Sequence, residues 1–162
     1  MASKRPIEKT VFVVRSVAVE NMDGALEACR KRWPEKELVA ITDFECHPEL
    51  VADSRISDAI VPNELSNGFR GAWLTNEQAE VVVVPVANRN GVGYANVFKF
   101  MKGVKAREWY LAQRGGTLKR VDFSTILRQV RIEWWSRILL VPVSYVLTFF
   151  MTRREPRRAT VV

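Results

Sequence analysis

The chain is predicted to fold as an α/β domain with a doubly wound, mostly parallel sheet of five strands, followed by a long C-terminal membrane-associated helix. Three observations lead to this prediction. Short β-branched runs alternate with segments of helical periodicity, which is typical of right-handed βαβ units. The run Val81–Val86 (VVVVPV) is continuously apolar, as expected for a central strand covered on both faces. The run Ile132–Met151 (IEWWSRILLVPVSYVLTFFM) has a length and composition that suit a lipid bilayer.

The five strands are predicted where β-branched and apolar residues gather between turn signals. Pro85 must lie near the end of the fourth strand, because proline donates no hydrogen bond to a sheet. A further segment, Thr117–Val121, is expected to be a short extension. The predicted strands are Thr10–Val14, Leu38–Thr42, Asp58–Val61, Val81–Val86 and Glu108–Ala112.

The first helix is expected after a cap from Asn21 or Asp23 and before Pro34, with an inward face formed by Leu26, Cys29, Arg30 and Trp33. Asp122 or Ser124 is expected to cap the long helix that runs to Met151. The other predicted helices are His47–Ala52, Trp73–Glu80 and 94–102. The expected organisation is an arm (1–9), a Rossmann-like α/β domain (10–121), an amphipathic and then apolar helix (122–152) and a basic tail (153–162).

The net charge of +7 is unevenly placed. Residues 1–113 hold fifteen basic and fifteen acidic side chains, whereas residues 114–162 hold ten basic and three acidic ones. Basic charge on both sides of an apolar helix fits anionic lipid headgroups, each cation contributing about 1 kcal/mol near the surface. A nucleic-acid binder would more often spread this charge over its folded domain, so no nucleic-acid partner is expected.

As a helix, the twenty residues Ile132–Met151 would be roughly 30 Å long, which matches a hydrocarbon core. Three arrangements stay open: a single span, a helix that re-enters or lies in the interface because Pro142 bends it, and a buried helix of a soluble domain. The residues expected to contact lipid or a partner helix are Trp134, Trp135, Arg137, Leu139, Val143, Tyr145, Phe149, Phe150, Arg153 and Arg154.

Two loops are candidates for a ligand site, because both follow parallel strands whose carboxyl ends share one edge of the sheet. Arg15 ends the first strand, although a surface salt bridge is an alternative role for it. The loop after the fourth strand offers amide donors, one positive charge and permissive backbone ahead of a helix, a combination that can hold a phosphate or carboxylate. The candidate residues are Arg15, Asn88, Arg89, Asn90, Gly91 and Gly93.

Residues for catalysis or for metal binding are sparse. Cys29 and Cys46 are the only cysteines; Cys29 falls on the apolar helix face, where a buried free thiol is expected. The lone His47 precedes Pro48 and is expected at a helix start. No catalytic residue, metal or cofactor is therefore expected. The N-terminal residues MASKRPIEK contain no apolar run of signal-peptide type, so we expect the domain in the cytoplasm and the anchor at the inner membrane.

Two stretches resemble the N-terminal Rossmann-like half of GT-B glycosyltransferases of the heptosyltransferase kind. Val14-Arg15 matches a first strand that ends in Arg, and Arg30–Pro34 matches a helix that ends in a basic run, an aromatic residue and Pro. The stretch VVVVPVANRNGVGYANVFKFM is similar to the fourth strand, loop and helix of such halves. The resemblance covers about residues 10–121. It departs from the family because no Gly-Asp pair follows Arg15 and the C-terminal donor-binding domain is replaced by the apolar helix.

The resemblance implies the fold and a retained ligand cleft, but one half of such an enzyme is not expected to transfer a sugar alone. We therefore expect a membrane-anchored, cytoplasmic accessory or scaffold subunit that is not an enzyme, with anionic lipids and other membrane protein subunits as its partners. The alternative is half of a glycosyltransferase-like enzyme that binds a nucleotide or a phosphorylated glycan lipid and needs a partner chain.

Overall fold

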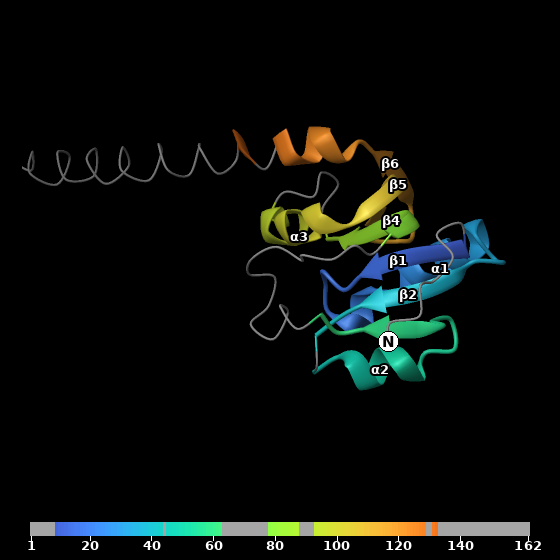
Figure 1. Ribbon diagram of the computed structural model, residues 1–162. Coiled ribbons are helices and arrows are strands. Elements are labelled where there is room, and N and C mark those ends of the chain that lie inside the picture. The colour runs from blue at the N-terminus through green and yellow to red at the C-terminus, as the bar shows by residue number, and fades with distance from the viewer. Residues whose placement is uncertain (1–8, 44, 63–77, 88–92, 129–130, 133–162) are drawn as a thin grey trace, which may run out of the picture. The chain divides into compact units, whose positions relative to one another are not determined.

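The computed structural model describes residues 9–43, 45–62, 78–87, 93–128 and 131–132. These residues form a six-stranded sheet in the order β3-β2-β1-β4-β5-β6, in which only β6 is antiparallel to its neighbour (Figure 1). The strands are β1 (Thr10–Val14), β2 (Glu37–Ile41), β3 (Asp58–Ile60), β4 (Gln78–Val86), β5 (Lys105–Gln113) and β6 (Leu118–Val121). The predicted α/β class and mostly parallel sheet are confirmed.

In the described ranges, three α-helices lie between strands: α1 (Asp23–Arg32), α2 (His47–Ala52) and α3 (Ala95–Phe100). Two 3₁₀ turns, η2 (Val19–Asn21) and η4 (Met101–Gly103), precede α1 and follow α3. A further helix begins after β6 and is described at residues 123–128 and 131–132. No helix among the described residues is long and apolar enough to cross a bilayer.

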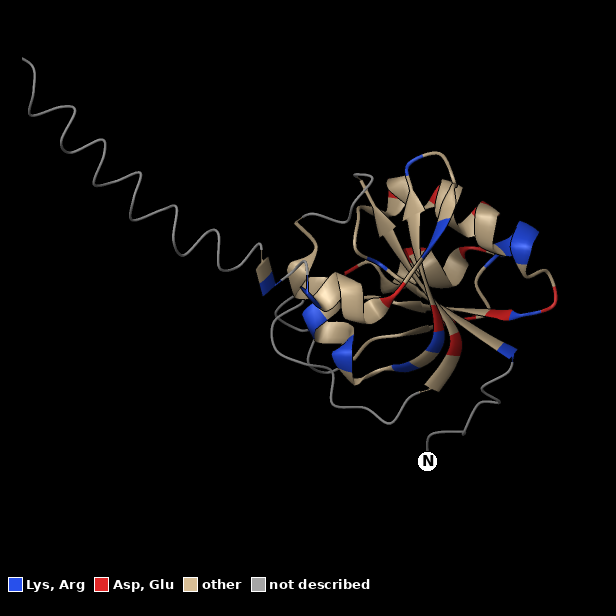
Figure 2. Ribbon diagram, turned by 90° about the horizontal axis from the view of Figure 1, so that it is seen from above, with Lys and Arg blue, Asp and Glu red and all other residues tan. Residues whose placement is uncertain are grey.

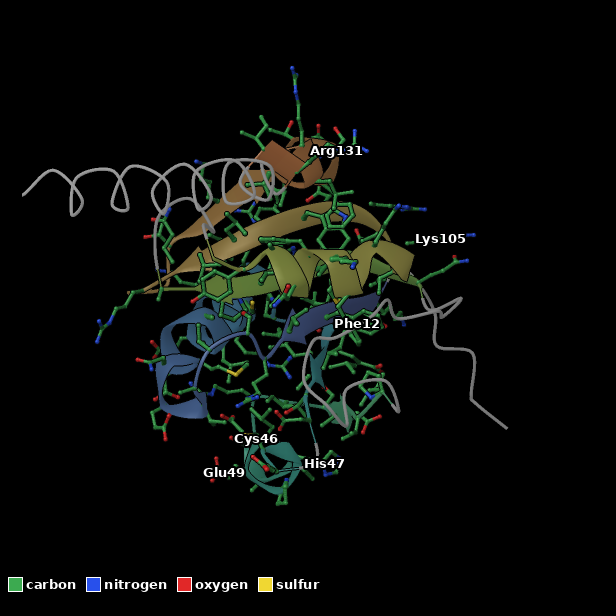
Figure 3. The ribbon with its side chains drawn as sticks, turned by 90° about the vertical axis from the view of Figure 1, so that its left-hand side faces the viewer. Phe12, Cys46, His47, Glu49, Lys105 and Arg131 are labelled. Atoms are coloured by element: carbon green, nitrogen blue, oxygen red, sulfur yellow. The ribbon has the colours of Figure 1, made fainter. Side chains whose placement is uncertain are left out.

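Helices lie on both faces of the sheet, as a doubly wound fold requires. One core cluster joins α1 and α2 to alternate residues of the strands, including Val11 and Val13 of β1. The residue between them, Phe12, is also buried and therefore faces the other side of the sheet (Figure 3). The second face is covered in part by α3, whose Val97, Phe98 and Phe100 are buried outside that cluster.

The strand predictions hold best where the apolar run is continuous. β1 has the predicted bounds, and β4 is a central strand with Pro85 next to its end. The predicted helix Trp73–Glu80 is wrong at residues 78–80, which belong to β4. Gln78 and Ala79 lie opposite Lys105 and Ala106 of β5, so pairing with a neighbouring strand overrides their local preference for helix.

The predicted count of five strands is also wrong, because Thr117–Val121 contributes β6. A turn with Gly115 and Gly116 at positive φ returns the chain beside β5, and both glycines suit such a turn. Val121 lies opposite Trp109, the middle residue of β5, so β6 ends halfway along β5. The last helix therefore begins beside the amino-terminal half of β5.

One of the two predicted helix caps is correct. The Asp122 carboxylate accepts hydrogen bonds from the Ser124 backbone N–H (3.2 Å) and the Thr125 hydroxyl (3.0 Å). These bonds hold the pKa of Asp122 below its usual value. The cap predicted for α1 is wrong, since its N-cap is Met22 without a side-chain hydrogen bond. Asp23 instead forms a 2.6 Å ion pair with Arg55.

Residues 1–127 form one compact unit and residues 128–162 a second one. The first unit contains the whole sheet and both sites described below. In the second, residues 128, 131 and 132 are described, and all three are exposed.

Candidate functional site

The carboxyl ends of β1 and β4 lie side by side at the place where the direction of chain progression reverses. From β1 the chain passes through α1 to β2, toward one edge of the sheet, and from β4 it passes through α3 to β5, toward the other edge. Loops that leave adjacent parallel strands in opposite directions open a crevice between them. This strand order is the one found in doubly wound dinucleotide-binding folds, in which the ligand occupies that crevice.

A pocket of about 310 Å³ occupies this crevice, and we call it the switch-point pocket. Its wall comes from the loop after β1, the first turn of α1, the end of β4, the residue before α3 and the end of β5 with its turn. The residues that line it are Val17, Ala18, Asn21, Ala25, Pro85, Val86, Ala87, Tyr94, Ala112, Gln113 and Arg114.

Two glycines hold the β5–β6 turn against the first turn of α1. A Cβ atom built on Gly116 would lie 2.7 Å from the backbone O of Gly24, and one built on Gly24 would lie 3.0 Å from the Gly116 N. Gly116 also has a φ of +83°, which side chains disfavour. The close approach of these two backbone segments places Arg114 and Ala25 on the same pocket.

The polar side chains that line the pocket are the guanidinium of Arg114, the phenol of Tyr94 and the amides of Asn21 and Gln113. Arg114 and Asn21 are exposed, and Tyr94 is half-buried. The Tyr94 Oη accepts a 2.9 Å hydrogen bond from the Ala87 backbone N–H, the residue that follows β4. The lining residues include no carboxylate, imidazole or thiol. Their chemistry is that of a site which binds and orients an anion.

Arg15 lies at the end of β1, as predicted, but does not line the switch-point pocket. Its guanidinium forms an ion pair with Asp43, which follows β2 and also accepts a 3.1 Å hydrogen bond from the Cys46 backbone N–H. The salt bridge considered from the sequence is thus present, at side chains about a quarter exposed. Whether Arg15 also binds a ligand stays a prediction.

The other predicted ligand residues come from the loop between β4 and α3. Gly93 is the first described residue after this loop, and its φ of +93° suits the turn that leads into α3. Asn88, Arg89, Asn90 and Gly91 lie outside the described residues. So do the residues predicted to contact membrane: Trp134, Trp135, Arg137, Leu139, Val143, Tyr145, Phe149, Phe150, Arg153 and Arg154.

A second, shallower hollow lies at the opposite edge of the sheet, where β5 begins and β6 ends. We call it the basic groove. It has a volume of about 700 Å³ and is lined by Lys102, Val104, Lys105, Ala106, Arg107, Glu108, Trp109, Arg120, Val121, Asp122 and Phe123. Trp109 and Phe123 stack with their ring centroids 4.0 Å apart, which joins β5 to the start of the last helix.

Cations outnumber carboxylates among the groove residues. Lys102, Lys105 and Arg107 are exposed, and Lys105 extends away from the sheet (Figure 3). Arg120 forms a 3.0 Å ion pair with Glu108. Elsewhere in the described part of the chain, basic and acidic residues both occur, and α1 ends in a second basic run, Arg30–Arg32 (Figure 2). The groove is therefore a local excess of positive charge.

An aromatic and charged network ties the end of α1 to β5 near this edge. The Arg32 guanidinium lies 5.0 Å from the Tyr110 ring centroid and donates a 3.1 Å hydrogen bond to its hydroxyl. The Tyr110 hydroxyl donates to Glu108 at 2.8 Å. Burial, followed by this hydrogen bond, raises the pKa of Tyr110. The network is a structural link between α1 and β5.

Both cysteines and the histidine lie where structural roles are expected. Cys29 is buried in α1, as predicted, and burial raises the pKa of its thiol to about 12. His47 begins α2, also as predicted, next to Cys46 and near Glu49 (Figure 3). No group of three or more His, Cys, Asp or Glu side chains in the described ranges could hold a metal ion.

The sequence analysis missed Asn21, Tyr94 and Arg114 as pocket residues. The end of β5 was not among the loops predicted to bind a ligand. The available signal was that β5, like β1 and β4, ends at the carboxyl edge of a parallel sheet.

No protein family, curated protein or solved structure matches the chain. The resemblance to glycosyltransferases therefore stays a prediction.

Proposed function

We propose that this protein is a Rossmann-like accessory domain held at the cytoplasmic face of the inner membrane by its C-terminal segment, where it serves as a non-catalytic subunit of a membrane protein assembly. The observation that carries the proposal is the apolar, aromatic run Ile132–Met151 with arginines on both sides. The arrangement of that run as a span, a re-entrant helix or an interfacial helix is part of what must be tested.

The basic groove supports this proposal. The last helix begins at the groove, because Phe123 is both a groove residue and the partner of Trp109. Phe123 and Ile132 are nine residues apart, which limits their separation to roughly 32 Å even in an extended chain. The chain that leaves the groove at Phe123 thus leads directly into the segment that contains the apolar run. Each cation near an anionic surface contributes about 1 kcal/mol of attraction.

The groups at the switch-point pocket support a binding role. Arg114, Tyr94 and Asn21 can position an anion, and the rest of the lining is largely apolar. Acid–base catalysis uses groups that exchange protons near neutral pH, such as histidine or a perturbed carboxylate, and the lining residues named above are of neither type. An accessory domain that senses or holds a ligand fits this chemistry.

Extraction and vesicle flotation test the membrane attachment. The full chain should stay in the membrane pellet at alkaline pH and should float with liposomes, more completely when these contain anionic lipid. A double variant, Lys102→Gln with Lys105→Gln, should reduce flotation with anionic liposomes only. A matched variant, Lys31→Gln with Lys119→Gln, removes the same charge from exposed residues outside the groove and should float like the parent. Release of the parent chain into the supernatant by carbonate would contradict the proposal.

A second candidate function is half of a glycosyltransferase-like enzyme that binds a nucleotide or a phosphorylated glycan lipid and works with a partner chain. The observation that favours it is the position of the switch-point pocket at the reversal of strand order. Co-purification in mild detergent tests it: a partner carrying a second Rossmann-like domain is expected, and a partner made only of membrane helices would favour the accessory role.

A further inference from the structure

The switch-point pocket offers a positive charge that no described carboxylate balances. Arg114 is exposed in the turn after β5, and none of the ion pairs among the described residues includes it. A guanidinium presents planar, paired N–H donors that match the oxygens of a phosphate or carboxylate. Its position at the rim of a concave site, rather than on a convex surface, makes it available to a bound ligand.

Tyr94 adds a second donor with a defined direction. Its Oη already accepts a hydrogen bond from the Ala87 N–H, so the hydroxyl hydrogen is directed elsewhere. The side-chain amide of Asn21 can supply a third donor from the opposite wall. The described lining residues therefore bring together donors from three separate parts of the chain and include no anionic group. This combination selects a ligand with negative charge.

The remaining lining is apolar and consists of small side chains. Val17, Ala18, Ala25, Pro85 and Ala112 leave room for a flat ring and offer it few hydrogen bonds. A sugar hydroxyl cluster would lose hydrogen bonds to water against such a wall, whereas an aromatic base can place its apolar ring face there with its polar edge directed elsewhere. The volume of about 310 Å³ lies at the lower end of the range for small-molecule sites. It suits a ligand of the size of a mononucleotide.

We infer that the switch-point pocket binds a nucleoside monophosphate, with the phosphate on Arg114 and Tyr94 and the base ring against the apolar wall. The inference deepens the second candidate function, on whose ligand-binding role it rests. It also assigns to the site three residues that the sequence analysis did not select. It does not depend on attachment to a membrane.

Calorimetric titration of the full chain in neutral detergent micelles tests the inference. The probes are adenosine 5′-monophosphate, uridine 5′-monophosphate, adenosine and inorganic phosphate. At least one monophosphate should bind at least tenfold more tightly than adenosine and inorganic phosphate. Arg114→Gln should weaken its binding at least tenfold, and Ala18→Trp, which fills the pocket from an exposed position, should abolish it. Lys119→Gln, an equal loss of charge on the neighbouring strand, should change the affinity less than twofold.

Three results would overturn the inference. They are no binding of either monophosphate, equal affinity for inorganic phosphate and monophosphate, and unchanged affinity in the Arg114→Gln variant. Thermal unfolding of each variant without ligand shows whether it remains folded, and a second substitution, Tyr94→Phe, tests the same anion contact independently. A chain that floats with liposomes but binds no probe would refute this inference and leave the membrane proposal intact. A chain that binds the monophosphate but fails to float with liposomes would refute the membrane proposal and leave this inference intact.

Discussion

The contact between Gly24 and Gly116 allows a stability prediction with an internal control. In Gly116→Ala, the new Cβ would meet the Gly24 carbonyl oxygen at 2.7 Å and would also occupy a backbone with φ of +83°. In Gly115→Ala, the φ is +98° but no atom lies within 4 Å of the new Cβ. Both substitutions pay a cost of about 1–2 kcal/mol for the left-handed backbone. Only Gly116→Ala adds the steric conflict, for which about 1–3 kcal/mol is expected.

The difference between the two variants is the measurable quantity, because effects of alanine on the unfolded chain are the same in both and cancel. Urea unfolding of the full chain in mild detergent, followed by tryptophan fluorescence, should give a midpoint for Gly116→Ala that is about 0.5–1.5 M lower than for Gly115→Ala, at a slope of about 2 kcal/mol/M. Equal midpoints would show that α1 and the β5–β6 turn do not approach as closely as described. The wall of the switch-point pocket would then need a different account.

Three other predictions concern the core, the pH dependence of stability and the last helix. Leu26→Ala should lower the free energy of unfolding by about 2–5 kcal/mol, because Leu26 is 1% exposed and belongs to the core cluster that includes α1. The control is Glu27→Ala at the exposed neighbouring residue, which should stay within about 0.5 kcal/mol of the parent. Burial raises the pKa of the Cys29 thiol from 9.0 to about 12, so the unfolded chain loses this proton first and stability should fall by about 1.4 kcal/mol per pH unit between these values. Denaturation of Cys29→Ala should show a shallower decline than the parent above pH 9, and parallel curves would contradict the assignment. Asp122→Ala should speed amide hydrogen exchange at Ser124, since it removes the acceptor of that backbone N–H, and unchanged exchange there would refute the cap.

The elements that could be predicted from the sequence are those with a strong local signal. β1 is a run of β-branched residues with no polar interruption, and α2 begins at His47-Pro48, where proline fits the first helical turn. Both have the predicted bounds. β6 was not predicted as a strand, because Lys119 and Arg120 are both exposed and do not alternate with buried residues. Its strand conformation depends on pairing with β5, and the hydrophobic periodicity of the sequence does not predict that pairing.

The position of the candidate site in the fold could be predicted from the sequence, but the residues that line it could not. The rule that ligands bind at the carboxyl edge of parallel strands pointed to the loops after β1 and β4, and the switch-point pocket lies there. Arg15 directly follows β1, as predicted, yet its guanidinium pairs with Asp43. Arg114 lines the pocket because Gly24 and Gly116 let two distant segments meet. Such an approach requires glycine at both positions. The local sequence does not distinguish these glycines from those of an ordinary turn.

The antiparallel strand β6 determines where the last helix begins relative to the switch-point pocket. Had the chain continued from Gln113 directly into its last segment, that segment would begin beside the pocket. Instead β6 carries the chain back along β5, so the last helix starts at Phe123, at the far edge of the sheet from the pocket mouth. If the proposed attachment through this segment holds, four residues of antiparallel strand separate the start of the attached helix from the pocket, and a ligand could reach the pocket while the protein stays attached.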